Sequence, residues 1–244
     1  MPCRTTRPRS AAQLILLFAM VAVAAGRSSI LFGQSQANES RVQKLYGEAK
    51  ASEAQGDPAT AIAKYEEIVK MAPRMGAAYN NLGLLYLRQA QYEDAVRILQ
   101  QGLKVAPKLP SAHALLGISY FQLNKYAEAR PHLEAALRAN PADNNAALIL
   151  AKDLSSLEDF NAAAAQLQQL AKRQPENQEL WYLLGKIYMK LSEQALAKMN
   201  ALDPDSALVH EMSGQIMEAM KNFDGALVEY KKAVEMAPTR PGSH

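Results

Sequence analysis

A ladder of prolines constrains the fold of this chain more than any other feature. Prolines recur every 34 residues through most of the chain, with one shorter interval of 29 residues: Pro73, Pro107, Pro141, Pro175, Pro204 and Pro238. Proline cannot continue a helix interior, so each of these residues is expected to separate two helices. A fixed period of this size is typical of stacked helical units. We therefore expect an all-α chain built from one repeated helix–turn–helix unit.

The first helix of each unit shows a regular apolar face. In the second unit Tyr79, Leu82, Gly83 and Tyr86 are spaced i, i+3, i+4 and i+7, which is one side of an α-helix. Glycine in a helix interior costs about 1 kcal/mol relative to alanine. We therefore expect these glycines where two helices cross closely, and the aromatic residues in the core. The same places hold His113, Leu116, Gly117 and Tyr120 in the third unit, and Trp181, Leu184, Gly185 and Tyr188 in the fifth.

The second helix of each unit carries a small residue followed four positions later by a large one. Large residues on either side of a close crossing pack as ridges into grooves. The pairs are Ala61 with Tyr65, Ala95 with Leu99, Ala129 with Leu133, Ala163 with Leu167, and Ala226 with Tyr230.

This combination of Leu-Gly-x-x-Tyr, a downstream Ala, a large residue and Pro resembles the tetratricopeptide repeat (TPR), over about residues 38–240. The resemblance implies a right-handed superhelical solenoid of about six antiparallel helix pairs with a concave groove. It also implies that the chain binds partners, because this architecture seldom carries out chemistry. The units would be about 42–75, 76–109, 110–143, 144–177, 178–206 and 207–240, followed by a tail at 241–244. At the start of the repeats the sequence predicts a first helix from about Arg41 to Gln55. Asp57-Pro58 predicts the start of the second helix, because Asp can cap a helix and Pro fits its first turn.

The fifth unit, 178–206, is five residues shorter than the others. Counting back from Pro204 places Ser192, Leu196 and Met199 on the packing face of its second helix, so the missing residues fall at the turn. Two outcomes are open: a tight turn near Lys190 capped by Ser192, or one helix that runs through. The return of the repeat register after Pro204 favours the turn.

Residues 1–37 lie outside the repeat, and we interpret them as a signal peptide and a disordered lead. Arginines at 4, 7 and 9 precede an apolar run over 11–25, which is typical of a secretory signal. Cleavage after Ala25 or after Ala37 would fit. The alternative is an uncleaved membrane anchor, although the run is shorter than the roughly 20 residues of a spanning helix. We therefore expect an exported chain, periplasmic or secreted, that would touch a membrane only through this segment.

The charge balance gives no reason to expect nucleic-acid binding. The formal net charge is +3, but four arginines lie in the N-terminal segment. Without them, 23 of the 27 basic residues remain against 24 acidic residues. A nearly neutral chain lacks the basic surface that nucleic acids require.

The sequence also lacks the motifs of a catalytic or cofactor site. Cys3 is the only cysteine and precedes the apolar run, so a mature chain would have no thiol nucleophile. His210-Glu211 begins like a zinc-protease motif, but Gly214 stands where the second histidine must be. No phosphate-binding loop is present. We therefore expect no enzyme activity, no cofactor and no metal.

The resemblance further implies which residues line the groove, because first helices face it in this family. Several of the residues concerned are apolar and fall outside the packing pattern, which suggests an extended or helical apolar peptide as ligand. The alternative is that they pack against neighbouring first helices. The subtype that holds a C-terminal carboxylate is matched only at Asn80, since Tyr46, Ser111 and Leu115 stand at the places of its other polar or basic residues. The candidate groove residues are Asn80, Leu84, Leu87, Arg88, Ile118, Phe121, Lys152, Tyr182, Lys186 and Met189.

The sequence thus predicts a non-catalytic scaffold that binds a protein or peptide. Two alternatives remain: an assembly subunit that self-associates through its C-terminal repeat, and a fragment of a larger protein of the same family. The chain stops at His244, where a seventh unit would begin, and solenoids normally end in a cap with a polar outer face. Apolar residues of the last helix, such as Phe223 and Leu227, are therefore expected to be partly exposed.

Overall fold

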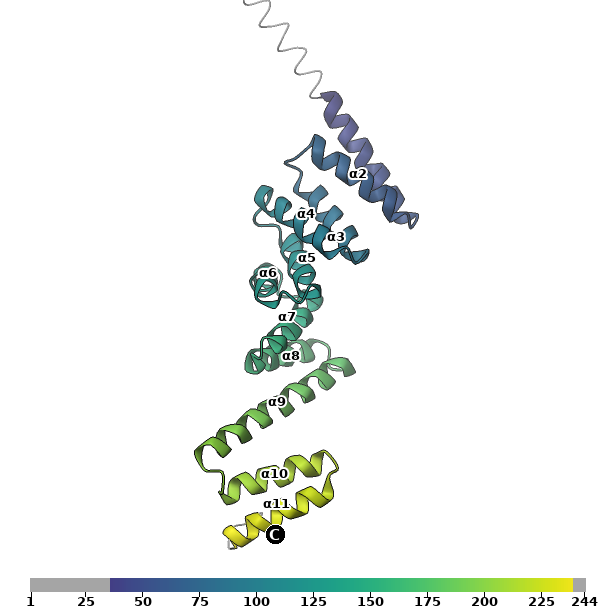
Figure 1. The fold of residues 1–244 in the computed structure, drawn as a ribbon. Coiled ribbons are helices and arrows are strands. Elements are labelled where there is room, and N and C mark those ends of the chain that lie inside the picture. The colour runs from purple at the N-terminus through teal and green to yellow at the C-terminus, as the bar shows by residue number, and fades with distance from the viewer. Residues whose placement is uncertain (1–35, 239–244) are drawn as a thin grey trace, which may run out of the picture. The chain divides into compact units, whose positions relative to one another are not determined.

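The computed structural model describes residues 36–238, and all regular structure in that range is helical (Figure 1). The expected all-α class of helix–turn–helix repeats is therefore confirmed. The chain divides into two compact units, one up to Leu116 and one from Gly117 onward. The predicted signal segment lies almost wholly outside the described residues. Residues 36–54 form one helix, so the helix predicted to begin at Arg41 begins earlier and residues 36–37 are not a disordered lead.

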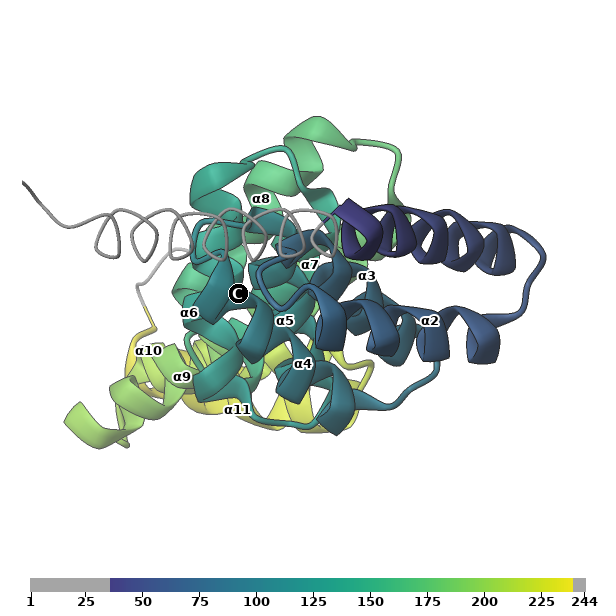
Figure 2. The ribbon, with the colours of Figure 1, turned by 90° about the horizontal axis from the view of Figure 1, so that it is seen from above.

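The first unit contains the helix over residues 36–54 and three further complete helices. The 36–54 helix and α2 run side by side in both views of the chain (Figures 1 and 2). The link between them ends as predicted, because the Thr60 N–H donates to Asp57 Oδ1 at 3.1 Å and Pro58 opens α2. The complete helices are α2 (Pro58–Met71), α3 (Gly76–Arg88) and α4 (Tyr92–Val105), and α5 (Pro110–Gln122) runs from this unit into the next.

The second unit contains six complete helices after α5. Most of them alternate between the first and second position of a repeat, as in the first unit. Their bounds are α6 (Tyr126–Ala139), α7 (Asn144–Ser156), α8 (Phe160–Arg173), α9 (Gln178–Leu202), α10 (Ala207–Ala219) and α11 (Phe223–Met236).

The turn within a helix pair is closed by one residue in the left-handed conformation. This residue is Gly56 in the first pair, but alanine, asparagine, glutamate or lysine in the others: Ala90, Asn124, Glu158 and Lys221, with φ between 56° and 62°. The following N–H then donates to a carbonyl five residues earlier, as from Gln91 to Tyr86 at 2.9 Å. This is the hydrogen bond that ends many helices.

Replacing Ala90 by glycine is expected to stabilise the chain, although the same change inside a helix destabilises. A side chain at positive φ is strained by about 1–2 kcal/mol, whereas glycine adopts this conformation freely. We expect the free energy of unfolding in urea to rise by about 0.5–1 kcal/mol, after the greater entropy of unfolded glycine is subtracted. The control is Ala51→Gly, in an exposed helical position, which should lower it. If Ala90→Gly lowered the free energy of unfolding as much as Ala51→Gly does, this account would be contradicted.

The links between helix pairs are held by the aromatic residue of the next first helix. The Tyr79 hydroxyl donates to the carbonyl of Pro73 at 3.3 Å, and Trp181 Nε1 donates to that of Pro175 at 2.8 Å. His113 Nε2 lies 3.0 Å from the carbonyl of Pro107 in the same way. The polar tip of this side chain therefore gives a hydrogen-bond partner to a backbone carbonyl in the link just beyond the helix end.

Two of the repeat glycines lie at close helix crossings, as predicted. A Cβ atom at Gly83 would lie 2.5 Å from Leu99 Cγ, and one at Gly117 would lie 2.7 Å from Leu133 Cγ. Leu99 and Leu133 are fully buried. The glycine in the first helix therefore makes room for the large residue of the second.

The fifth repeat does not form a helix pair, and the predicted turn near Lys190 is wrong. Helix α9 is unbroken from Gln178 to Leu202, and none of its residues, all of them described, adopts a positive φ. The physical reason is the five-residue deletion, which removes the turn and leaves strong helix formers on both sides of position 190.

The packing residues of the fifth repeat consequently have no second helix of their own repeat to pack against. A Cβ at Gly185 would meet no described atom within 4 Å, so its predicted place at a crossing is wrong. Trp181 and Tyr188 were expected in the core, but they are 54% and 45% exposed. The three errors have one cause, because each of these residues was placed against a second helix that does not fold back.

Candidate functional site

In the first unit, the predicted groove residues all lie on α3. Leu84 and Leu87 are half-buried and Arg88 is exposed. Asn80 is one turn before Leu84, and its Oδ1 is buried with no hydrogen-bond partner among the described residues. An unpaired buried acceptor carries a desolvation cost of about 1–3 kcal/mol, which a peptide N–H would remove. The face therefore combines apolar surface with an acceptor that is unused but covered, so the Asn80 side chain would have to rotate to bind a ligand.

In the second unit, the predicted residues are divided among three helices. Ile118 on α5 is only 9% exposed, so packing accounts for it better than ligand contact does. Phe121 is half-buried, and its ring centroid lies 5.6 Å from that of Tyr126. On α7, Lys152 forms an ion pair with Glu179 at 2.9 Å.

The remaining three predicted residues lie on α9 and face solvent. Tyr182 is 66% exposed, and Lys186 Nζ lies 5.7 Å from its ring centroid. Met189 is also exposed. These three side chains are available for contact, but they stand on the helix whose predicted turn is missing.

Sequence reasoning missed Asp153, a fully buried carboxylate on α7. Neither of its oxygens has a hydrogen-bond partner among the described residues. Arg130 is near enough to act on it electrostatically, but its guanidinium binds Glu134 at 2.9 Å and Asp159 at 3.4 Å. The repeat register could have revealed this residue, because Leu85 holds the same place in the repeat over residues 76–109.

Burial raises the pKa of Asp153 from 3.8 to about 6. The positive charge of Arg130 acts in the opposite direction, and the negative charge of Glu134 adds to the rise. A carboxyl group of this kind could take part in proton transfer in an enzyme. Here it lies in closed packing, and we identify no nucleophile beside it in the part of the chain that the structure describes.

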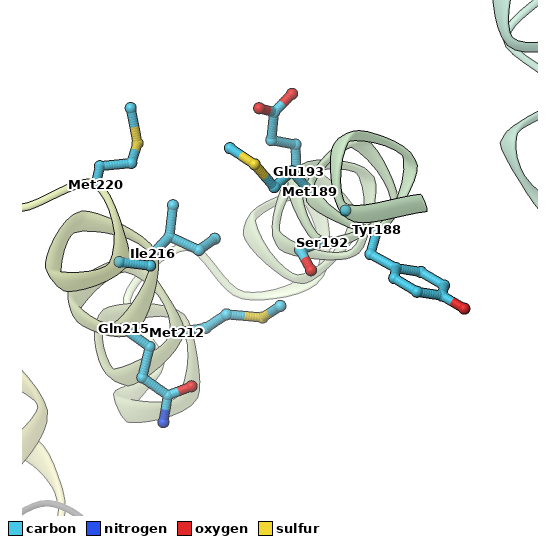
Figure 3. A pocket seen from close by; sticks show the side chains of 10 residues that line it. Tyr188, Met189, Ser192, Glu193, Met212, Gln215, Ile216 and Met220 are labelled. Atoms are coloured by element: carbon cyan, nitrogen blue, oxygen red, sulfur yellow. The ribbon is translucent and has the colours of Figure 1, made fainter. Parts of the chain in front are cut away.

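Sequence reasoning also missed an apolar groove between α9 and α10, of about 380 Å³ (Figure 3). Met189 and Ser192 line it from α9, and Met212 and Ile216 project toward them from α10. Methionine side chains adapt to many shapes of apolar partner. The groove could not be read from the sequence, because the two helices border it only if α9 continues past residue 190.

The last helix shows the expected exposure. Phe223 and Leu227 on α11 are 64% and 54% exposed. On the same helix pair, His210 Nδ1 lies 2.6 Å from Glu229 Oε2. Hydrogen bonds from His210 and Lys232 lower the pKa of Glu229.

Residues 36–238 contain no group of three or more histidine, cysteine, aspartate or glutamate side chains that could hold a metal ion. Within the same range, no helix has both the length and the apolar character needed to cross a membrane.

Comparison with protein-family models gives three matches along the helices described above. All three are models of the tetratricopeptide repeat, over residues 53–118, 110–143 and 148–197. The chain is a tetratricopeptide repeat protein. Proteins of this family are generally interaction scaffolds that bind proteins or peptides rather than catalysts.

Solved structures with this TPR fold include YrrB, described as a TPR protein with an unusual peptide-binding site. It is 21% identical, with a TM-score of 0.51, over 73% of this chain and 95% of YrrB. MamA from Desulfovibrio magneticus RS-1 is 17% identical, with a TM-score of 0.52, over 82% of this chain and 97% of MamA. At these identities the likeness shows the fold alone. A search among curated proteins found no significant match.

Proposed function

We propose that this TPR protein is an exported, non-catalytic scaffold that binds a protein or peptide along its first helices. The observation that carries the proposal is the face of α3. There Asn80 offers a buried oxygen without a partner, beside the half-buried Leu84 and Leu87 and the exposed Arg88. Apolar side chains would hold apolar residues of the ligand, and the amide would bind its backbone. The peptide-binding site described for YrrB supports the same class of ligand.

Exchanging Leu87 for glutamate is expected to abolish capture of the partner. A carboxylate in the apolar face would have to be desolvated on binding, which costs several kcal/mol. The measurement is affinity capture from an envelope extract with the full chain as bait. The matched control is Val105→Glu, a similar exchange on a second helix of the same unit, where Val105 is 37% exposed.

The outcomes of this capture are distinct. A protein retained by the parent and by Val105→Glu, but lost with a still-folded Leu87→Glu chain, supports binding at α3. Phe121→Glu tests the second unit separately in the same way. Equal loss with Val105→Glu, or no loss with either groove variant, would contradict the proposed surface.

Export is tested on the same material. A signal peptide would be removed, so the mass of the chain recovered from the envelope should correspond to cleavage after Ala25 or Ala37. An intact chain that remains in the membrane fraction would support the N-terminal anchor instead. An intact chain in the cytoplasmic fraction would contradict export.

A further inference from the structure

Helix α9 carries the packing residues of a complete helix pair on one straight helix. In a complete pair the first-helix glycine faces the large residue of the second helix, as Gly83 faces Leu99. In α9 these two places are held by Gly185 and Leu196. Eleven residues of α-helix separate them by about 16 Å. Gly185 therefore cannot face the leucine of its own chain, and its surface is open.

We propose that α9 pairs antiparallel with α9 of a second copy of this chain, so that Gly185 of each faces Leu196 of the other. Because both residues lie on the same helix, one two-fold axis near residues 190–191 forms both contacts at once. This self-complementarity is what an interface between two identical chains requires. The same axis also brings together the residues that correspond to the other contacts within a complete helix pair. These are Trp181 with Met199, and Tyr188 with Ser192.

The surfaces that would pair are accessible in the single chain. Trp181 and Tyr188 are about half exposed, and Leu196 and Met199 are only partly buried. The groove between α9 and α10 adjoins this surface, with Met189 on its wall (Figure 3). The second α9 would lie along the groove and cover apolar side chains that the single chain leaves in water.

The charges on α9 favour the antiparallel arrangement. Lys186, Lys190 and Glu193 are spaced i, i+4 and i+7, so they share one flank of the helix. The two-fold axis brings this flank against the same flank of the second copy, with Lys186 of each opposite Glu193 of the other. A parallel pair would instead place this flank against the opposite flank of the second helix, so these charges would not meet. In the single chain Lys190 pairs with Glu193 at 2.8 Å, and Lys186 lies over the Tyr182 ring. All three charged groups are exposed, so pairing would exchange these contacts for contacts between the two chains.

Light scattering on the full chain tests the pairing. We expect a mass twice the 26.7 kDa of one chain. Gly185→Leu should reduce the mass to that of a monomer with no loss of helix content, because its Cβ would meet no described atom of its own chain within 4 Å but the side chain would occupy the place of Leu196 of the second copy. Gly47→Leu, at another open helical glycine, should leave the dimer intact.

Two results would overturn the proposal. One is a monomeric parent chain at all concentrations, and the other is a dimer that Gly185→Leu leaves unchanged. A further variant, Leu227→Glu, alters another exposed apolar surface, on α11. A dimer lost with Leu227→Glu alone would assign self-association to α11 and reject α9.

Cross-linking tests the direction of the helices. Tyr188→Cys and Ser192→Cys are made separately in a Cys3→Ser background, mixed and oxidised. The antiparallel pair predicts disulfide-linked dimers that contain one chain of each variant. Links only between identical variants would indicate a parallel pair and contradict the proposed axis. The pairing depends on α9 alone, so its failure would leave peptide binding at α3 unaffected.

Discussion

Gly117→Leu is expected to lower the free energy of unfolding by about 1–3 kcal/mol, because it overpacks a close helix crossing. A Cβ at this position would lie 2.7 Å from Leu133 Cγ and 3.1 Å from the backbone nitrogen of Leu133. The leucine side chain can rotate, but the backbone nitrogen moves only if α5 and α6 separate. Leu133 is fully buried, so a separation would also expose apolar surface. Urea unfolding followed by far-UV circular dichroism measures the loss.

The control for Gly117→Leu is the same exchange at Gly47. This glycine lies in the 36–54 helix, and a Cβ there would meet no described atom within 4 Å. Leucine is a better helix former than glycine by roughly 0.5–1 kcal/mol, so Gly47→Leu should stabilise. A lower free energy of unfolding for Gly117→Leu together with a higher one for Gly47→Leu would show that the crossing requires a residue without a side chain. Similar changes in both variants would contradict the assignment of Gly117 to a crossing.

Asp153→Asn is expected to stabilise the chain at neutral pH and to lose most of that advantage in acid. The carboxyl binds its proton more tightly in the folded chain, where its pKa is about 6, than in the unfolded chain, where it is near 3.8. Its charge therefore destabilises the fold above pH 6, and this penalty disappears as the pH falls through 6 toward 4. The shift of about two units corresponds to at most about 3 kcal/mol at pH 7.5.

Thermal unfolding at pH 7.5 and pH 4.5 measures this effect. The melting temperature of Asp153→Asn should exceed that of the parent at pH 7.5, and the two should approach each other at pH 4.5. Asp205→Asn, at an exposed position, removes the same charge without relieving burial and should show no such pattern. An equal gain at both pH values would mean that the pKa of Asp153 is not raised on folding, and would contradict this account.

The sequence alone determined the repeat and most of its local structure. The 34-residue spacing predicted helix pairs, Asp57-Pro58 predicted the start of α2, and Gly83 and Gly117 predicted close crossings. These features depend on residues near one another in the chain or at equivalent places in successive repeats. Periodicity records such local relations directly, so they could be read without coordinates.

The tertiary structure alone decided what happens where the repeat is interrupted. The register after Pro204 favoured a turn near Lys190, but the deletion left no residue in the left-handed conformation and α9 continued. That continuation exposes Trp181, opens the surface of Gly185 and forms the groove beside Met212. The reason is physical: a turn forms only if its backbone conformation costs less than adding further helical residues, and the repeat pattern contains no information on that balance.

Asp153 is a second case in which the sequence did not predict the packing of a residue. The repeat register indicates a buried position that sequence reasoning missed, and only the tertiary structure shows that Arg130 is already held by Glu134 and Asp159. Burial and partner choice depend on several helices at once, and a single sequence lists the charged residues without pairing them. The sequence therefore determined the fold and the class of interaction. Tertiary packing decided which groups remain exposed or without partners, and the proposed contacts use two of them, Asn80 and Trp181.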